Sequence, residues 1–534
     1  MLRLLRAQAR RDRLQLLIWI LGTALFAVGS GSAVAREFGG ERSREELLRL
    51  VSLNPALLAI RGVPDGASTG AVIFFELFTY LALLAALMST FLVTRHSRGD
   101  EEQGRTELVR STPIHRASAL GATLLLGALA NLALALAIGL GLAATGLPLG
   151  GSMLTGFATG GCGLAFCGVA ALAAQIAKTG RASNTIAGVT AGLAWAIRAL
   201  GDALGTASPD GLRVTSAWPS WLSPIGWGQQ THAFSSDARW SPLLLDLALF
   251  AGTAVVALVV VSRRDLGAGL VGDRPGRATG SLHSSIGLAW RLQRGGVIGW
   301  AAGAAVLGLF AGGLAQPAIE ALRSNPSVAD VVDRLVAGRT DDLLDTFVAA
   351  IMTFLGVLAA GAAMQAVLRA RTEESEGRTE LLLSGRGGPG NSLRDALIVA
   401  MGSLVAVAVA GGLFAAGALA AAGHPERFGG SVASAFVQLP AAAVFAALAG
   451  LVFAVLPRAA VPVGWTVLML GFVLGQFGAL FRLPRAIRDL SPFSHTPVVP
   501  GPDIDWAPVI VMAIIALAVA IIATALSHRR DLVS

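Results

Sequence analysis

Apolar segments of about 20 residues or more alternate with short polar segments along the whole chain. Each apolar segment is long enough to cross the ~30 Å hydrocarbon core of a membrane as a helix. The pattern therefore predicts an all-α polytopic membrane protein with twelve transmembrane helices. The first six segments are Leu14–Ala35, Ala71–Val93, Ala119–Leu142, Ser152–Ala177, Asn184–Gly205 and Ser241–Val261. The second six are Val297–Ala315, Leu344–Leu368, Asp395–Ala422, Ser431–Leu456, Ala459–Phe481 and Ala507–Leu526.

The composition supports this fold class. Hydrophobic residues make up 54% of the chain and charged residues only 14%, whereas soluble domains carry about 25% charged residues. Glycine occurs 65 times, and small residues allow membrane helices to approach closely. Cys162 and Cys167 lie in one apolar segment without histidine or cysteine partners at metal-ligand spacing. We interpret them as packing residues and predict no metal site.

Basic residues gather in the polar segments that would lie on one side of the membrane. These are residues 1–13, 94–118, 178–181, 262–294 and 369–394 and the tail from His528. Because cytoplasmic loops are enriched in arginine and lysine, we expect a multi-pass protein of the bacterial plasma membrane, surrounded by lipid, with both termini in the cytoplasm. The net charge of +8 then requires no nucleic acid as partner, since no basic stretch is interleaved with aromatic residues. Met1–Arg13 is expected to form an amphipathic helix at the membrane interface.

Several landmarks occur twice in the same order, which indicates an internal duplication. Six spans in each half would make the two copies parallel. We therefore predict two parallel six-helix repeats: a first half at 1–262 with the N-terminal amphipathic helix, a cytoplasmic linker at 263–294, and a second half at 295–534. The paired landmarks are Arg13 and Trp19 with Arg294 and Trp300, Asn54-Pro55 with Asn325-Pro326, Leu222-Ser223-Pro224 with Leu490-Ser491-Pro492, and Arg263-Arg264-Asp265-Leu266 with Arg529-Arg530-Asp531-Leu532.

A charged segment is also repeated, after the second apolar run of each half. Asp100–Leu108 reads D-E-E-Q-G-R-T-E-L, and Glu373–Leu381 reads E-E-S-E-G-R-T-E-L. In both copies a glutamate precedes an arginine by four residues, a favourable ion-pair spacing on a helix, and the intervening glycine marks a bend. A leucine then supplies an apolar anchor. The pattern predicts a short cytoplasmic helix that docks a soluble partner; the alternative is a solvated loop shaped only by the membrane topology.

This segment resembles the coupling helix of type-2 ATP-binding cassette (ABC) permeases, and the first copy continues to Ser111-Thr112-Pro113 as that family does. The fused twelve-span form is similar to actinobacterial polyketide-antibiotic exporters of the tetronasin class. The resemblance implies a permease subunit of an ATP-driven exporter of antibiotics, drugs and other hydrophobic or amphipathic compounds. The first coupling site would comprise Glu101, Glu102, Gly104, Arg105, Thr106, Glu107 and Leu108. The second would comprise Glu373, Glu374, Gly377, Arg378, Thr379, Glu380 and Leu381, followed by a glycine-rich insertion in place of the proline.

The chain has no phosphate-binding loop of its own. Such a loop needs G-x-x-x-x-G-K-[ST], and the single lysine, Lys178, follows Ala177 where the motif requires glycine. We therefore expect no catalytic site and no bound cofactor on this chain. The resemblance then implies two copies of a separate ATP-binding cassette subunit, which would hold ATP and Mg²⁺.

Ionisable residues within membrane spans are functional candidates. Glu76, with Phe75 and Phe78 beside it, is a candidate for the substrate path, or it is a solvated structural residue near the outer end. Arg198 and Asp202 are expected to pair on one helix face. An apolar cavity between the halves would suit a hydrophobic small-molecule cargo. A proton-driven secondary multidrug carrier, which we expect to need a relay of acidic residues, and a lipid exporter of the ABC class are the alternatives.

Overall fold

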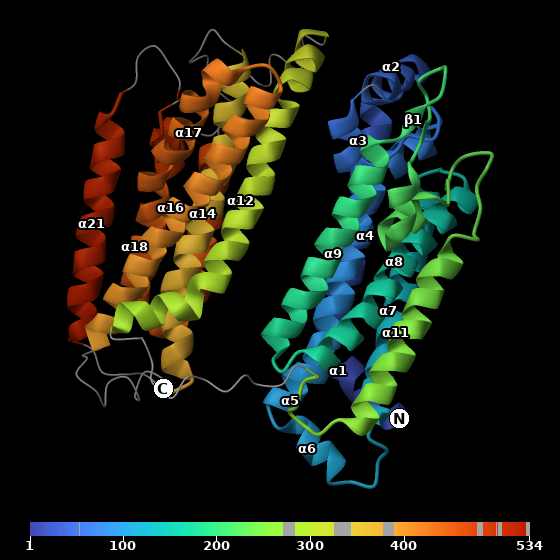
Figure 1. The fold of residues 1–534 in the computed structure, drawn as a ribbon, viewed down its shortest axis with the longest axis horizontal. Helices are drawn as coiled ribbons and strands as arrows, with labels where there is room; N and C mark the ends of the chain where they lie inside the picture. The colour runs from blue at the N-terminus through green and yellow to red at the C-terminus, as the bar shows by residue number, and fades with distance from the viewer. Residues whose placement is uncertain are drawn as a thin grey trace. The chain divides into compact units, whose positions relative to one another are not determined.

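The computed structural model describes residues 1–52, 54–270, 284–324, 343–377, 389–477, 484–497, 499 and 505–529. The chain divides into two compact units, Met1–Gly276 and Arg277–Ser534. Each unit is described by itself. Both consist of long apolar helices joined by short helical and irregular segments (Figure 1).

In the first unit, six long helices run side by side (Figure 1). Short elements cap the two ends of this bundle: α2, α3 and a two-stranded ribbon lie at one end, and α5, α6 and the N-terminus lie at the other. The long helices are α1 (Leu2–Glu37), α4 (Thr69–Thr94), α7 (Ser118–Ala144), α8 (Leu149–Ile176), α9 (Gly180–Ala203) and α11 (Leu243–Arg263). The short helices are α2 (Glu41–Ser52), α3 (Pro55–Arg61), the π-helical turn η1 (Arg95–Gly99), α5 (Asp100–Glu102), α6 (Arg105–Arg110), η2 (Trp218–Leu222) and α10 (Pro224–Gln229), and β1 (Thr206–Ala207) pairs antiparallel with β2 (Val214–Thr215).

Small residues set the helix spacing in this unit. A Cβ atom placed on Gly156 of α8 would lie 2.1 Å from the carbonyl oxygen of Ala135 in α7, so the two backbones are in direct contact. A Cβ atom placed on Gly127 of α7 would lie 2.4 Å from the sulfur of Cys167 on α8, so this side chain packs directly on the glycine. Cys162 and Cys167 are buried, free thiols, so their predicted role in packing is confirmed. Close glycine contacts of this kind hold membrane helices together where lipid supplies no hydrophobic driving force.

The second unit contains a similar series of long helices. A proline interrupts one of them: Pro440 lacks a backbone donor, and the helical segment divides at Gln438 into α17 and α18. The elements are α12 (Ser285–Ser324), α14 (Leu343–Ser375), α16 (Pro389–Ala421), η3 (Pro425–Arg427), α17 (Phe428–Val437), α18 (Leu439–Val455), η4 (Pro457–Ala459), α19 (Ala460–Phe477), α20 (Arg485–Arg488), η5 (Pro492–His495) and α21 (Ala507–His528). Gly308 and Gly312 of α12 pack directly on the backbone of α16.

Eleven helices among the described residues are long and apolar enough to cross a membrane. The chain is therefore a multi-pass, mostly helical membrane protein, as the apolar pattern predicted. The helix missing from that set is α9, which covers the predicted span Asn184–Gly205 but carries buried polar residues, among them Arg198 and Asp202. Whether α9 is a twelfth span, and whether the halves are repeats, stay predictions. The basic segment Met1–Arg13 is helical and continuous with the first span in α1.

Candidate functional site

The charged segment Asp100–Leu108 forms two short helices joined by a bend. The π-helical turn η1 leads from α4 into α5, and the chain then bends at Gly104 into α6. Gly104 has a φ of +69°, a left-handed conformation that glycine adopts at no steric cost. Gly377 has a φ of +71° at the same place in the second copy. The bend predicted at both glycines is confirmed, and it explains why both copies carry glycine there.

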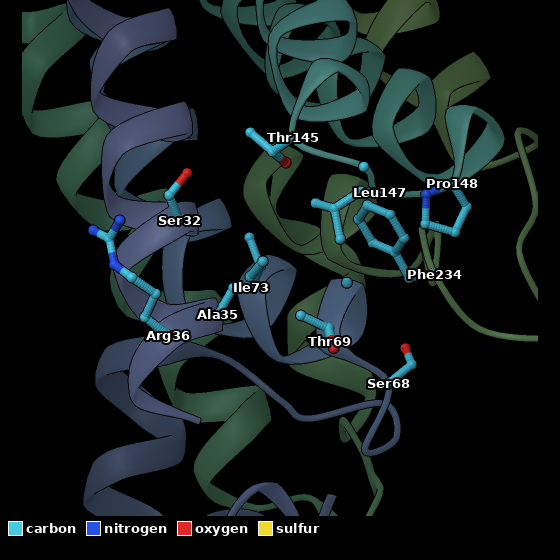
Figure 2. Close-up of a pocket in the computed structure, with 13 residues that line it drawn as sticks. Ser32, Ala35, Arg36, Ser68, Thr69, Ile73, Thr145, Leu147, Pro148 and Phe234 are labelled. Atoms are coloured by element: carbon cyan, nitrogen blue, oxygen red, sulfur yellow. The ribbon is translucent and has the colours of Figure 1, made fainter. Parts of the chain in front are cut away.

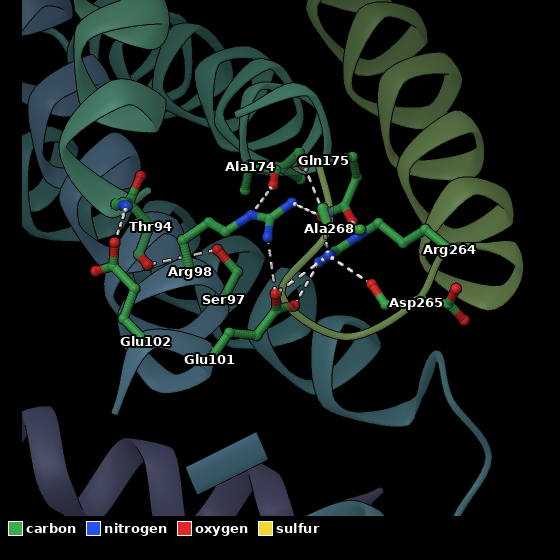
Figure 3. Close-up of polar contacts among 12 residues, drawn as sticks. Thr94, Ser97, Arg98, Glu101, Glu102, Ala174, Gln175, Arg264, Asp265 and Ala268 are labelled. Carbon is green, nitrogen blue, oxygen red and sulfur yellow. Dashed lines mark hydrogen bonds and ion pairs between the residues drawn. The ribbon is translucent and has the colours of Figure 1, made fainter. Parts of the chain in front are cut away.

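Glu101 is buried inside the unit, between two arginines (Figure 3). Its Oε2 atom lies 2.9 Å from Nη1 of Arg98 and 3.1 Å from Nη1 of Arg264, and its Oε1 atom accepts from Nη2 of Arg264. The arginines reach further partners: Arg98 donates to the carbonyl oxygen of Ala174, and Arg264 Nε donates to Gln175 Oε1 at 2.7 Å. We call Arg98, Glu101 and Arg264 the arginine clamp.

The arginine clamp joins three distant parts of the chain. Arg98 follows α4, Ala174 and Gln175 belong to the last turn of α8, and Arg264 follows α11 directly. Both arginines also donate to the carbonyl oxygen of Ala268, each at 2.7 Å. Removing one member of a buried, hydrogen-bonded ion pair typically costs about 3–5 kcal/mol. Glu101 therefore fixes the position of the charged segment and lies away from its outer surface.

Glu102 holds the start of a different helix. Its Oε1 atom accepts a hydrogen bond at 3.0 Å from the backbone N–H of Gly180, the first residue of α9 (Figure 3). Beside it, the side chain of Thr179 caps the same helix by accepting from the N–H of Ala182 at 3.1 Å. A carboxylate at a helix N-terminus satisfies unpaired donors and interacts favourably with the helix dipole.

Arg105 pairs with a different acid from the one that its spacing predicted. The predicted partner was Glu101, four residues earlier, but Arg105 Nη1 lies 2.8 Å from Oδ1 of Asp100. The prediction was wrong because Gly104 interrupts the helix, so the i,i+4 neighbourhood is not formed. The same Asp100 oxygen also accepts from Arg11 of α1 at 2.6 Å, which ties the charged segment to the first helix.

The exposed part of the segment is α6 with the residues on either side of it. Leu108 is 74% exposed, and Gln103, Arg105 and Glu107 are exposed as well. Ser111–Arg116 continues this surface without a buried residue. Burial lowers the pKa of Arg110 at the end of α6, and the nearby carboxylate of Glu101 opposes the shift; the guanidinium stays charged, because arginine does not lose its proton in proteins. We call Gln103, Glu107, Leu108 and Ser111–Pro113 the α6 face.

The second copy is described only as far as its glycine. Glu373 pairs with Arg369 at 3.1 Å, and Glu374 is buried, with a relative exposure of 6%. Glu374 is the counterpart of Glu101, so the same acid of the motif points inward in both copies. Arg378, Thr379, Glu380 and Leu381 lie outside the described residues.

The residues predicted for a substrate path, Glu76, Phe75 and Phe78, have separate partners in the first unit, and their role stays a prediction. Glu76 forms an ion pair with Arg61 of α3. Phe75 and Phe78 are buried in two separate apolar clusters, and Phe78 stacks on Phe74. A pocket of about 600 Å³ lies elsewhere, at the end of the unit near α2. Figure 2 shows its lining, which includes Ser32 and Arg36 of α1, Thr69 of α4, Thr145, Pro148 and Phe234.

Arg198 and Asp202 form the predicted pair on α9, with Nη1 and Oδ2 separated by 3.0 Å. Both side chains are fully buried. Ser216 donates to Asp202 Oδ1 at 2.7 Å, and Arg198 Nη2 donates to the carbonyl oxygen of Ala59 at 2.8 Å. The pair fastens α9 to α3 and to the segment after β2, so it is a structural network.

Sequence reasoning missed two groups of buried ionisable residues. His96 lies between Asp12 of α1 and Asp100, with Nε2 at 2.8 Å from Asp12 Oδ2 and Nδ1 at 3.5 Å from Asp100 Oδ2. Asp246 is buried in α11. The signal for Asp246 was present, since it is an acid inside the apolar segment Ser241–Val261. The signal for His96 was absent, because its partner Asp12 lies 84 positions away.

Comparison with known proteins places these features in a family. The family model described as "Multidrug efflux system permease Rv1217c, C-terminal domain" matches residues 5–261 and 282–527. The chain is 34% identical over 536 residues to the multidrug efflux system permease protein Rv1217c of Mycobacterium tuberculosis (strain ATCC 25618 / H37Rv). This similarity covers 99% of the chain and 94% of that protein.

Proposed function

This chain belongs to the multidrug efflux system permease family of Rv1217c, and from that membership we propose that it is the membrane-spanning subunit of an ATP-driven exporter of drugs and other hydrophobic or amphipathic compounds. ATP and Mg²⁺ bind on a separate ATP-binding cassette subunit, of which two copies dock on the cytoplasmic side. The absence of a phosphate-binding loop from the sequence supports a separate motor.

The α6 face is the observation that carries this proposal. Leu108 is a large apolar side chain with 74% of its surface exposed, in a polar segment at the end of the unit opposite α2 and α3 (Figure 1). We infer that Leu108, an exposed apolar side chain in a charged segment, is an anchor for a partner protein. The resemblance of this segment to a coupling helix supports the docking of an ATP-binding subunit there.

The buried contacts of the charged segment connect α6 to the long helices, and in our proposal they transmit the movement that ATP hydrolysis produces. The arginine clamp connects the segment to α4, α8 and the end of α11, Glu102 connects it to α9, and Asp100 connects it to α1. Each connection is a charge-assisted hydrogen bond, the stronger class of hydrogen bonds in proteins. In our proposal, a displacement of α6 by the motor therefore moves the cytoplasmic ends of several helices together.

Reconstitution with its ATPase tests the proposal. The chain and a candidate ATP-binding cassette subunit from the same organism are incorporated into liposomes, and ATP hydrolysis and drug export are measured. Leu108→Asp is expected to reduce the stimulated ATPase activity and export by about tenfold or more, since it removes an apolar anchor from the docking surface. Leu204→Asp is the matched control: Leu204 is 60% exposed at the end of α9 and should leave both activities intact. Unchanged activity of Leu108→Asp would contradict the proposed docking site.

A proton-driven carrier is the second candidate, because Asp246 is a buried acid in a candidate span and such residues serve proton pathways in transporters. The two candidates differ in their energy source. Export that requires the ATPase subunit and withstands a protonophore supports the first. Export that persists without any ATPase subunit and collapses with the proton gradient supports the second.

A further inference from the structure

Helix α11 packs against α8 (Figure 1), and Asp246 lies on the face of α11 that contacts α8, next to Gly161. Its relative exposure is 0%, and neither carboxylate oxygen has a hydrogen-bond partner among the described residues. A Cβ atom placed on Gly161 of α8 would lie 3.4 Å from Oδ2 of Asp246, so the backbone of α8 passes directly over the carboxyl group. A buried polar group without a hydrogen-bond partner lowers the free energy of unfolding, because it has lost its hydration.

No positive charge compensates this acid within the helices that pack around it. Alpha-helix α11 contacts α8, α10 and α7, whose described residues include no Lys, Arg, His, Asp or Glu. Their titratable groups are the thiols of Cys162 and Cys167 on α8. A carboxylate buried without a partner takes up a proton in preference to remaining charged. Asp246 is therefore a neutral acid while α8 and α11 are packed together.

In the predicted repeat, the second unit has an apolar residue at the position of Asp246. Trp240 and Pro242 stand at the start of α11, and Trp506 and Pro508 stand at the start of α21 with the same spacing. The pair Arg263-Arg264 near the end of α11 recurs as Arg529-Arg530. The spacing is the same at both ends (506 − 240 and 529 − 263 are both 266), so the two segments align without a gap. This register places Met512 opposite Asp246. Met512 is buried, with a relative exposure of 6%, so an apolar side chain fills the equivalent position.

Two aromatic rings lie in contact near this position: Trp240, three residues before α11 begins, and Phe157 of α8, four residues before Gly161. Trp240 and Phe157 of α8 have ring centroids 5.4 Å apart and an interplanar angle of 60°. Trp240 is 51% exposed, and Leu244 and Leu247 beside it are exposed along α11. Aromatic faces attract cations, and an apolar surface accepts the body of a lipophilic molecule. The aromatic pair and the acid together suit an organic cation that reaches the protein from the membrane.

We propose that Asp246 is a cation-binding residue of the exporter: it carries a proton while α11 packs against α8, and it exchanges that proton for the positive group of an organic cation when this contact opens. The carboxylic acid releases H⁺ to water as the carboxylate pairs with the cation, so charge is conserved. Trp240 and Phe157 hold the apolar body of the same ligand. This proposal rests on the proposed export function only where transport is measured; the binding of the cation does not depend on it.

Binding of ethidium to the purified chain in lipid nanodiscs tests the site without ATP. We expect Asp246→Asn to weaken ethidium binding about tenfold or more, since it removes one charge of a desolvated pair. Asp246→Glu should retain binding, and Asp246→Met, which copies Met512, should fold normally and bind as weakly as Asp246→Asn. In weakly buffered solution, the wild type should release protons as ethidium binds and Asp246→Asn should release none.

A neutral lipophilic dye of similar size is the control ligand. Loss of ethidium binding with unchanged binding of the neutral dye supports the proposal. Equal loss of both ligands would assign Asp246 a structural role, and unchanged ethidium binding in Asp246→Asn would overturn the proposal directly. A wild type that binds ethidium through Asp246 but exports nothing with its ATPase would contradict the proposed function and leave this site standing.

Discussion

The two units fasten their charged segments with different chemistry. In the first, His96 lies between Asp12 of α1 and Asp100 of the segment. In the second, Arg369 pairs with Glu373 at 3.1 Å, and its Nη1 atom donates to the carbonyl oxygen of Leu292 in α12 at 2.8 Å. Each unit thereby ties its first long helix to the residues before the motif. The first uses an imidazole together with the guanidinium groups of Arg11 and Arg95, and the second uses the guanidinium of Arg369.

The residue before the arginine of the paired landmarks, Arg13 in the first unit and Arg294 in the second, also differs between the units. Asp12 is buried in the first unit, and Gln293 takes its place, also largely buried, in the second. In the first unit the carboxylate of Asp12 faces His96. In the second unit the uncharged amide of Gln293 takes that position, and Arg369 is paired with Glu373 instead. The comparison teaches that both units tie their first long helix to the motif, and from it we expect the ionisable groups at this contact to be exchangeable as a set.

The largest effect is expected from the arginine clamp. Glu101→Ala removes the only carboxylate between Arg98 and Arg264 in the described structure, and two buried guanidinium groups then lose their partner. We expect a loss of about 3–5 kcal/mol of unfolding free energy, measured by thermal unfolding in detergent. Glu374→Ala should also destabilise the chain, because Glu374 is buried at the equivalent place. A neutral Glu374→Ala would break the equivalence of the two units, and exposed Glu107→Ala serves as the control.

The exchange of the histidine set is expected to have an intermediate effect. Asp12→Gln copies Gln293 but leaves Arg95 and His96 without their buried acid, which should cost about 1–3 kcal/mol. Adding His96→Arg, which copies Arg369, should recover part of that loss through a new pair with Asp100. A double-mutant cycle of thermal unfolding measures this recovery. Strictly additive effects of the two substitutions would mean that the sets are not exchangeable.

The two bends should respond alike, at a smaller magnitude. Gly104→Ala and Gly377→Ala each force a residue with a Cβ atom into a left-handed conformation, at about 1–2 kcal/mol. Gly188→Ala in α9 is the control, since no atom lies within 4 Å of its new Cβ and alanine favours a helix. If only one of the two bend variants is destabilised, the segments bend for different reasons.

The smallest effect on stability is expected on the α6 face. Leu108→Ala removes a side chain that is already exposed, so the thermal unfolding temperature should stay within the change expected for about 0.5 kcal/mol. Stimulation of the ATPase should nevertheless fall. This split between stability and activity separates Leu108 from Glu101, whose substitution lowers both. A large loss of stability in Leu108→Ala would place that residue in the core of the segment.

The sequence predicted the features that follow from local physics. The long apolar segments appear as helices because a chain in lipid must satisfy its backbone internally, and the glycine bends appear because few other residues adopt that conformation. The direction of each acid could not be predicted. Glu101 and Glu102 are adjacent and identical, yet one faces Arg264, 163 positions later, and the other faces Gly180. Only the tertiary fold brings these partners to the segment. Asp246 was overlooked because one acid barely alters the hydropathy of α11.

The arginine clamp also sets an order for the making of the protein. Glu101 is synthesised 163 residues before Arg264, and all six long helices of the unit precede that arginine in the chain. The charged segment therefore leaves the ribosome early, with its buried glutamate unpaired by Arg264, and becomes fixed only when the last long helix of its unit has been inserted. A nascent chain that stops before Arg264 cannot complete the clamp, so the segment gains its full set of contacts only after the last long helix of the first unit has been synthesised.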